Sequence, residues 1–232
     1  MRLRMLAVLF ALSSVAADAP KPAAHTPRDI QGWTVHVDDR LLAGDDAELG
    51  RAAIACVDSQ LHNVALILPA DKVKRLRKVP IYLDRSHGKL VPAQYHPSPE
   101  WLIDNGYDRA LAKCVHVPDA KYFAGARHQR EQPYAMLHEL AHAYHDQVLG
   151  FGHAGVKAAH QRVKESKHFD QVLHVNGRES KHYALTNPME FFAEMTESYF
   201  GQNDFYPFNS GELAKSEPEV FQLLKELWGP LP

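Results

Sequence analysis

Hydrophobic residues recur along this chain with two different periods, which predict a mixture of strands and helices. Trp33, Val35 and Val37 alternate with polar residues and so predict a half-buried strand. Over residues 45–68 the apolar positions follow helical spacing instead, and Pro69 ends the pattern. We therefore expect the folded region to begin near residue 31 with a strand followed by a long helix.

The middle of the chain carries weaker signals of the same kinds. Short apolar runs at residues 79–83 and 114–117 predict two more strands. Residues 98–105 have helical spacing, and Gly106 suits the end of that helix. Strands and helices thus alternate irregularly, which favours an α+β fold.

The clearest helical pattern follows Pro133, a residue suited to a first helical position. Apolar residues keep helical period from there to Val148, and Gly150 is placed to end the helix. Residues 155–167 predict a further helix.

Residues 171–175 and 178–183 flank Asn176-Gly177, a dipeptide typical of a type I′ hairpin turn, so we expect a β-hairpin that ends at Tyr183. Asn187 followed by Pro188 resembles the cap and first turn of a helix that runs to about residue 200. A last amphipathic helix is expected over residues 218–228.

The N-terminus has the pattern of a signal peptide. Arg2 and Arg4 precede an apolar run over residues 5–12, and small residues follow at 14–16. We expect cleavage after Ala16, export to the periplasm or medium, and no stable membrane insertion afterwards, since no later segment is apolar enough to span a bilayer. An uncleaved N-terminal anchor is the alternative. Residues 17–30 are rich in Ala, Pro and Lys and predict a flexible leader, which leaves one folded domain over 31–232.

The chain contains two cysteines, Cys56 and Cys114. In an oxidising compartment a bridge between them would close a long loop, and this pairing is the interpretation we favour. Alternatively, both are small buried apolar residues. The formal charge of −2 gives no excess that would favour nucleic acid as a partner.

His138-Glu139-Leu140-Ala141-His142 lies within the predicted helix after Pro133. Residues four apart share one helix face, so both imidazoles can bind one zinc ion, and the glutamate between them can act as general base. An alternative is a helix with two surface histidines. A catalytic zinc needs a third protein ligand.

A histidine third ligand of the metzincin kind is excluded, because His145 and Val148 stand where that pattern needs Gly and His. Glutamates at 190, 194 and 197 share one side of the later helix. Glu190 suits a ligand and Glu194 a partner for a ligand imidazole, whereas Glu197 is expected to be a solvated or hydrogen-bonded carboxylate. Glu190 could equally serve a capping box.

The HELAH motif and the run from Tyr183 to Glu194, YALTNPMEFFAE, resemble the catalytic domains of anthrax lethal factor and the Pro-Pro endopeptidases. The resemblance implies a zincin-type fold in which a helix with HExxH and a second, glutamate-bearing helix lie beside a small sheet. It assigns the zinc to His138, His142 and Glu190, and implies that Tyr183 assists catalysis.

These observations predict a secreted zinc metallopeptidase with one zinc per chain that acts on a peptide or protein substrate. We expect Glu139 to move the proton and Tyr183 to stabilise the oxyanion. The sheet edge could hold an extended substrate. Two other functions stay open: a zinc protein that binds a peptide or envelope partner without cutting it, and a zinc hydrolase of another amide or ester.

Overall fold

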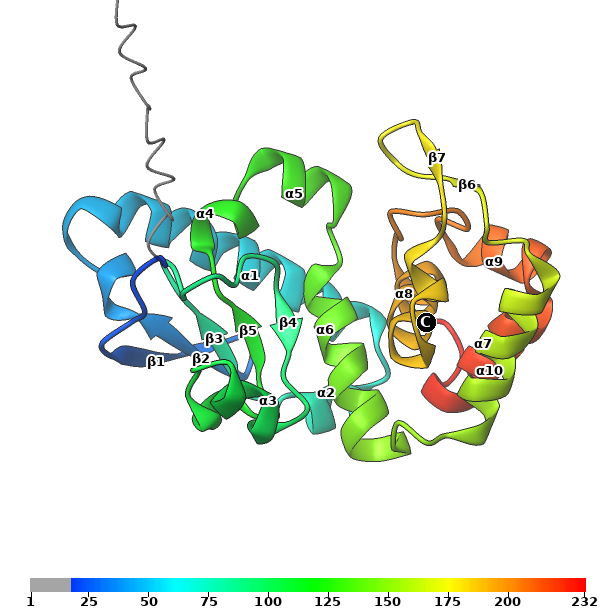
Figure 1. Ribbon diagram of the computed structural model, residues 1–232, viewed down its shortest axis with the longest axis horizontal. Helices are drawn as coiled ribbons and strands as arrows, with labels where there is room; N and C mark the ends of the chain where they lie inside the picture. Colours follow the sequence, from blue (N-terminus) through cyan, green and yellow to red (C-terminus); the bar gives the residue numbers. More distant parts are fainter. Residues whose placement is uncertain (1–17) are drawn as a thin grey trace, which may run out of the picture.

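The computed structural model describes residues 18–232, so the predicted signal peptide lies outside the described residues. A mixed sheet of five short strands forms one half of the domain, in the order β1-β2-β3-β5-β4 (Figure 1). β2, β3 and β5 are parallel, whereas both edge strands, β1 and β4, run antiparallel to their neighbours. The strands are β1 (His25–Ile30), β2 (Trp33–Asp38), β3 (Ile81–Leu83), β4 (Gln94–Tyr95) and β5 (Val115–Val117).

Edge strand β1 lies inside the segment predicted to be a flexible leader, so the sheet begins earlier than residue 31. Only Ile30 of this strand is buried, and its side chains therefore have no apolar period that reveals a strand. The turn to β2 consists of Gln31 and Gly32 with φ of 55° and 84°. Positive φ at both central residues is typical of a type I′ turn, which fixes the register of the hairpin.

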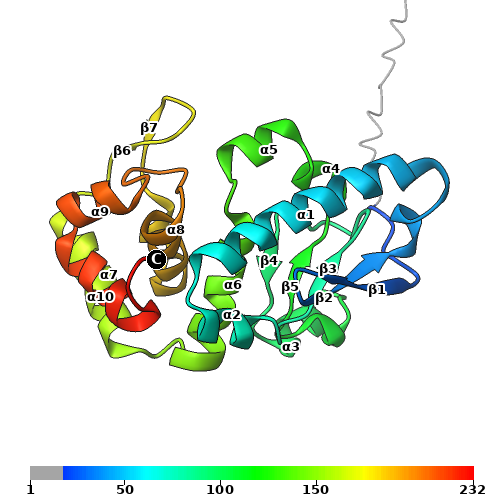
Figure 2. The ribbon, with the colours of Figure 1, turned by 180° about the vertical axis from the view of Figure 1, so that it is seen from behind.

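Helix α1 (Ala47–Ile67) crosses one face of the sheet (Figure 2). Its buried stripe of Ala53, Val57, Leu61 and Val64 has helical spacing and belongs to the main core. The remaining helices of this half are α2 (Ala70–Leu76), α3 (Pro99–Asp104), α4 (Ala120–Phe123) and α5 (Ala126–Glu131).

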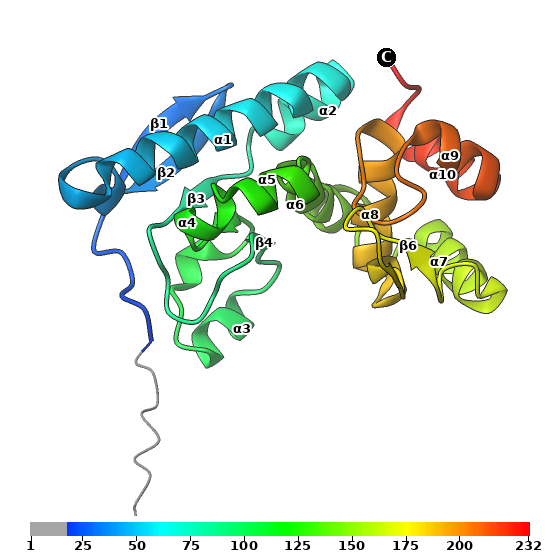
Figure 3. The same cartoon turned by 90° about the horizontal axis from the view of Figure 1, so that it is seen from above.

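The other half is mainly helical and meets the first along α6, which packs on α1 and β4 on one side and on α8 on the other (Figure 3). The α6 helix continues into a π-helical turn at His145–Leu149, and Gly150, with φ of 77°, follows it. The elements are α6 (Ala135–Tyr144), α7 (Ala154–Ser166), β6 (Val172–Leu173), β7 (Glu179–Ser180), α8 (Pro188–Phe200), α9 (Ser210–Ser216) and α10 (Pro218–Trp228). The whole is a single α+β domain, as the sequence predicts.

The predicted hairpin around Asn176-Gly177 is present, but its turn and its end differ from the prediction. Gly177 has φ of 84°, whereas Asn176 is not in the positive-φ region, so the turn is not type I′. The amide of Gly177 donates to the carbonyl of His174 at 2.8 Å. β7 ends at Ser180, and Tyr183 begins a short 3₁₀ helix, Tyr183–Leu185, because the His182 side chain caps it.

Cys56 and Cys114 are both free thiols, so the predicted bridge is wrong. Cys114 instead contacts the carbonyls of Ala110 and Ala112 in its own loop. Burial raises the pKa of Cys114 to about 11, as expected for a small apolar core residue. Among the described residues, no helix combines the length and apolar character needed to cross a membrane.

Candidate metal centre

The HExxH motif lies on α6, where the apolar face decides its orientation. Met136, Leu137, Leu140 and Ala141 are fully buried, and this burial turns the motif histidines toward α8. The rings of His138 and His142 lie edge to face with centroids 4.8 Å apart. The Nε2 atoms of both imidazoles approach the same carboxylate oxygen of α8.

Helix α8 brings Glu190 to the same point. Asn187 caps the helix by accepting hydrogen bonds from the amides of Met189 and Glu190, and Pro188 occupies its first turn. The Glu190 carboxylate thereby faces α6, and its Oε2 lies 3.2 Å from Nε2 of His138 and 3.2 Å from Nε2 of His142. The cap belongs to Asn187, and the Glu190 side chain contacts the histidines.

The distances among these donors suit a metal ion. Zinc bound tetrahedrally at about 2.0–2.1 Å places neighbouring ligand atoms about 3.3 Å apart. The donors of His138, His142 and Glu190 all lie within 4.8 Å of one another, so they could hold a metal ion. Although burial opposes it, the carboxylates of Glu190 and Glu197 raise the pKa of His138 well above its usual value, and the position thus favours positive charge.

The hydrogen bond predicted for Glu194 is made by Glu197. Nδ1 of His138 donates to Oε1 of Glu197 at 2.7 Å, whereas Glu194 lies 3.7 Å from that nitrogen. Since Glu197 lies two turns after Glu190, it contacts the Nδ1 side of the His138 ring, and Nε2 on the other side faces Glu190. Burial raises the pKa of Glu197 to about 7, against the effect of His138.

His138, Glu194 and Glu197 form a second group of possible metal ligands. Both carboxylates are buried, and burial together with the Glu197 charge raises the pKa of Glu194 well above its usual value. A catalytic ion needs an open position for water. His138 belongs to both groups. The group with His142 and Glu190 is the more open of the two, because Glu190 is only partly buried whereas Glu194 and Glu197 are both buried.

Glu139 is held by the edge of the sheet. Its Oε2 accepts a hydrogen bond of 2.6 Å from the backbone amide of Tyr95 in β4. The Tyr95 hydroxyl also donates to Asp146 at 2.6 Å, in the π-helical turn after α6. Strand β4 is thus bound once to α6 and once to the turn after it, and it orients the predicted base.

A cleft of about 560 Å³ passes over these groups. Tyr183 lines it and is 47% exposed, and burial of the rest of the ring is the main cause of its raised pKa. Gln94 and Tyr95 also line the cleft but carry no signal in the sequence, because a strand of two residues has no detectable period. The full lining is Pro92, Ala93, Gln94, Tyr95, Tyr122, His128, Gln132, Ala135, His138, Glu139, His142, Tyr183, Glu190, Glu194, Glu197, Asp204 and Phe205.

Comparison with known proteins adds no relative: no family model, no curated protein and no solved structure matches this chain. The geometry of the site therefore carries the functional argument.

Proposed function

We propose that this protein is an exported zinc metallopeptidase. The observation that carries the proposal is the convergence of His138, His142 and Glu190 in an open cleft, with Glu139 beside them. Two imidazoles and one carboxylate are a donor set typical of catalytic zinc. We also propose that the chain belongs to the same family as anthrax lethal factor and the Pro-Pro endopeptidases. Residues 1–16 would be removed on export.

In this proposal His138, His142 and Glu190 would hold one zinc ion, which supplies Lewis acidity that polarises the substrate carbonyl and lowers the pKa of water toward about 7. Glu139 takes the proton from the attacking water and delivers it to the leaving nitrogen. The amide of Tyr95 supports this role by fixing one carboxylate oxygen at 2.6 Å. Tyr183 donates its phenol hydrogen to the oxyanion that forms on the carbonyl.

An extended peptide is the substrate class that the cleft suits. β4 pairs with β5 on one side only, and its residues Gln94 and Tyr95 line the cleft. The amide of Tyr95 on this edge already donates to Glu139, so an incoming peptide would pair with the remaining backbone groups of the edge. Strand addition beside Glu139 would align a peptide bond with the proposed base.

The replacement Glu139→Gln tests the proposal against its two rivals. We expect zinc content to persist while cleavage of a peptide library falls by about 10²- to 10⁴-fold, because only the base is lost. Glu165→Gln, an exposed glutamate on α7, is the matched control and should retain full activity.

A binding protein would give no cleavage in wild type and the same partner affinity in the Glu139→Gln variant. A hydrolase of another kind would leave the peptide library intact while turning over a model ester or amide. Either result would contradict the peptidase.

A further inference from the structure

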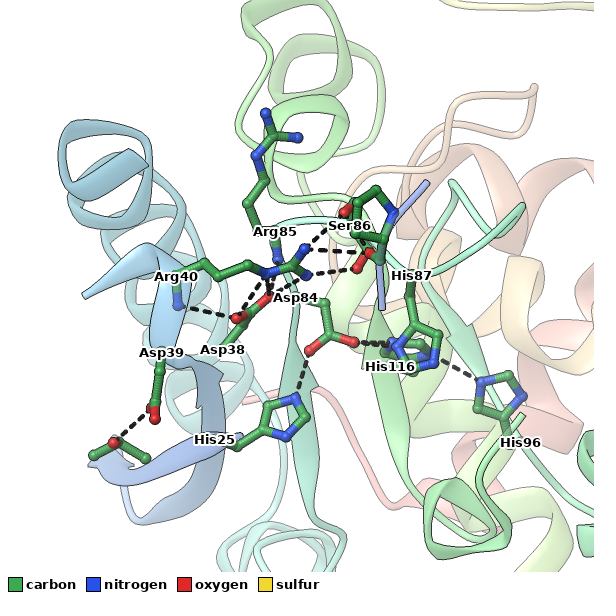
Figure 4. Close-up of polar contacts among 12 residues, drawn as sticks. His25, Asp38, Asp39, Arg40, Asp84, Arg85, Ser86, His87, His96 and His116 are labelled. Carbon is green, nitrogen blue, oxygen red and sulfur yellow. Dashed lines mark hydrogen bonds and ion pairs between the residues drawn. The ribbon is translucent and has the colours of Figure 1, made fainter. Parts of the chain in front are cut away.

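Asp84, outside the cleft, is the centre of a cluster of histidines. It follows β3 and is fully buried. Its Oδ1 lies 2.7 Å from Nε2 of His25, while its Oδ2 lies 2.5 Å from Nδ1 of His87 and 2.8 Å from Nε2 of His116 (Figure 4). His96 stands behind, with its Nε2 3.2 Å from Nδ1 of His116.

Backbone hydrogen bonds fix this cluster in the sheet. The amide of Asp84 donates to the carbonyl of Val117 at 2.8 Å, and the carbonyl of Asp84 accepts from the amide of Ala120 at 2.8 Å. His116 is an internal residue of β5, paired with Tyr82 of β3. The sheet therefore fixes the positions of Asp84 and His116.

The charge of Asp84 lacks a fixed counterion. Over residues 18–232, every ion-pair partner of Asp84 is a histidine. Nearby Asp38 is also fully buried but is matched by the guanidinium of Arg40 (Figure 4). A buried carboxylate is stabilised by hydrogen bonds or by positive charge, which here can come from imidazole N–H groups, an extra proton on one of them, or a metal ion.

We propose that Asp84, His87 and His116 bind a second divalent transition-metal ion of the zinc class. Their donor atoms lie within 4.8 Å of one another, and two imidazoles with one carboxylate suit zinc better than magnesium or calcium, which prefer oxygen. A shift from the observed 2.5 and 2.8 Å to the roughly 3.3 Å between zinc ligands is a small movement.

The outer histidines complete the arrangement. His25 hydrogen-bonds the other oxygen of Asp84 and orients it. With the ion on Nε2 of His116, Nδ1 of that ring carries the hydrogen and donates to His96. All three ligands are buried and none of them lines the cleft, so the ion would lie inside the fold with its fourth position left to a water molecule.

This second ion would stabilise the part of the sheet that borders the cleft. His116 is paired with Gln94 of β4, and the next residue, Tyr95, holds Glu139. The site goes beyond the proposed function and does not depend on it.

Metal analysis of the exported protein, purified without a tag, tests the site. In the double variant His142→Ala with Glu190→Ala, which removes the first centre, we expect one zinc per chain. Adding His87→Gln should reduce this to none. Adding His36→Gln instead should leave it at one, because His36 stacks on Tyr82 and is not among the ion-pair partners of Asp84 in the described residues.

Zinc absent from the double variant after loading, or retained when His87 is replaced, would overturn the second site. Loss of folding in the triple variant would be detected by circular dichroism. X-ray absorption of the cobalt-loaded double variant then decides: two imidazoles and a carboxylate support the site, and unbound cobalt refutes it. If the first centre does not bind zinc, the outcome is different, because wild type and the double variant would then bind equal amounts of zinc.

Discussion

At the scale of single residues, the site depends on which carboxylate orients His138. Glu197 accepts its Nδ1 hydrogen at 2.7 Å, whereas Glu194 stands 3.7 Å away, and over residues 18–232 its Oε2 accepts no hydrogen bond. Replacing Glu197 with Gln should weaken zinc binding by about 10- to 100-fold, the usual effect of losing such a partner. Chelator competition measures this.

Glu194→Gln is the matched control, because it lies on the same helix and is equally buried. Its effect on zinc affinity should be several-fold smaller. A larger loss of zinc affinity from Glu194→Gln than from Glu197→Gln would show that Glu194 orients the His138 ring.

Tyr183 carries the second residue-scale prediction. Tyr183→Phe should lower kcat by about 10²- to 10³-fold with unchanged zinc content, because it removes one donor to the oxyanion. Tyr122 lines the same cleft and is 44% exposed, against 47% for Tyr183, so Tyr122→Phe is a matched control that should retain its kcat. Equal losses in both variants would argue against a specific role for the Tyr183 hydroxyl.

At the scale of elements, the cap of α8 positions a ligand. Asn187→Ala should cost about 0.5–2 kcal/mol of unfolding free energy and also weaken zinc binding, because Glu190 lies in the first turn. Asn209 caps α9 with the same pair of amide contacts. Asn209→Ala should therefore cost similar stability, measured by urea unfolding, without changing zinc affinity. Equal zinc affinities in the two variants would show that the Asn187 cap does not position the zinc ligand.

The sequence predicted the helices that have a clear apolar period or a clear start signal. α1 and α10 have one apolar stripe, whereas α6 and α8 are buried on almost all sides, and α8 is marked by Asn187 and Pro188 at its start. Edge strands β1 and β4 were missed, since one is almost fully exposed and the other has two residues. The Asp84 cluster was missed for another reason: its histidines are dispersed over the sequence, and only the sheet brings them together.

At the scale of the whole molecule, buried histidines make stability depend on pH. Burial lowers the pKa of His182 to about 3, and mainly burial lowers that of His145 to about 4. The unfolded chain binds these protons near pH 6.5 and the native state does not. The contribution of these two histidines to stability is therefore full above pH 6.5 and falls as the pH drops toward 4, by up to about 1.4 kcal/mol per pH unit for each.

Urea unfolding at several pH values between 7.5 and 4.5, with chelator present, measures this slope. His182→Gln should flatten it, whereas His62→Gln, which changes an exposed histidine on α1, should not. The same slope in His182→Gln and wild type would contradict the assignment.

The central claim concerns one metal position between α6 and α8. Anomalous diffraction at the zinc edge, from crystals of the zinc-loaded exported protein, tests it most directly. We predict a peak about 2.0–2.2 Å from Nε2 of His138, Nε2 of His142 and a carboxylate oxygen of Glu190. No peak there, or a peak on the Nδ1 side of His138 between Glu194 and Glu197, would contradict the account.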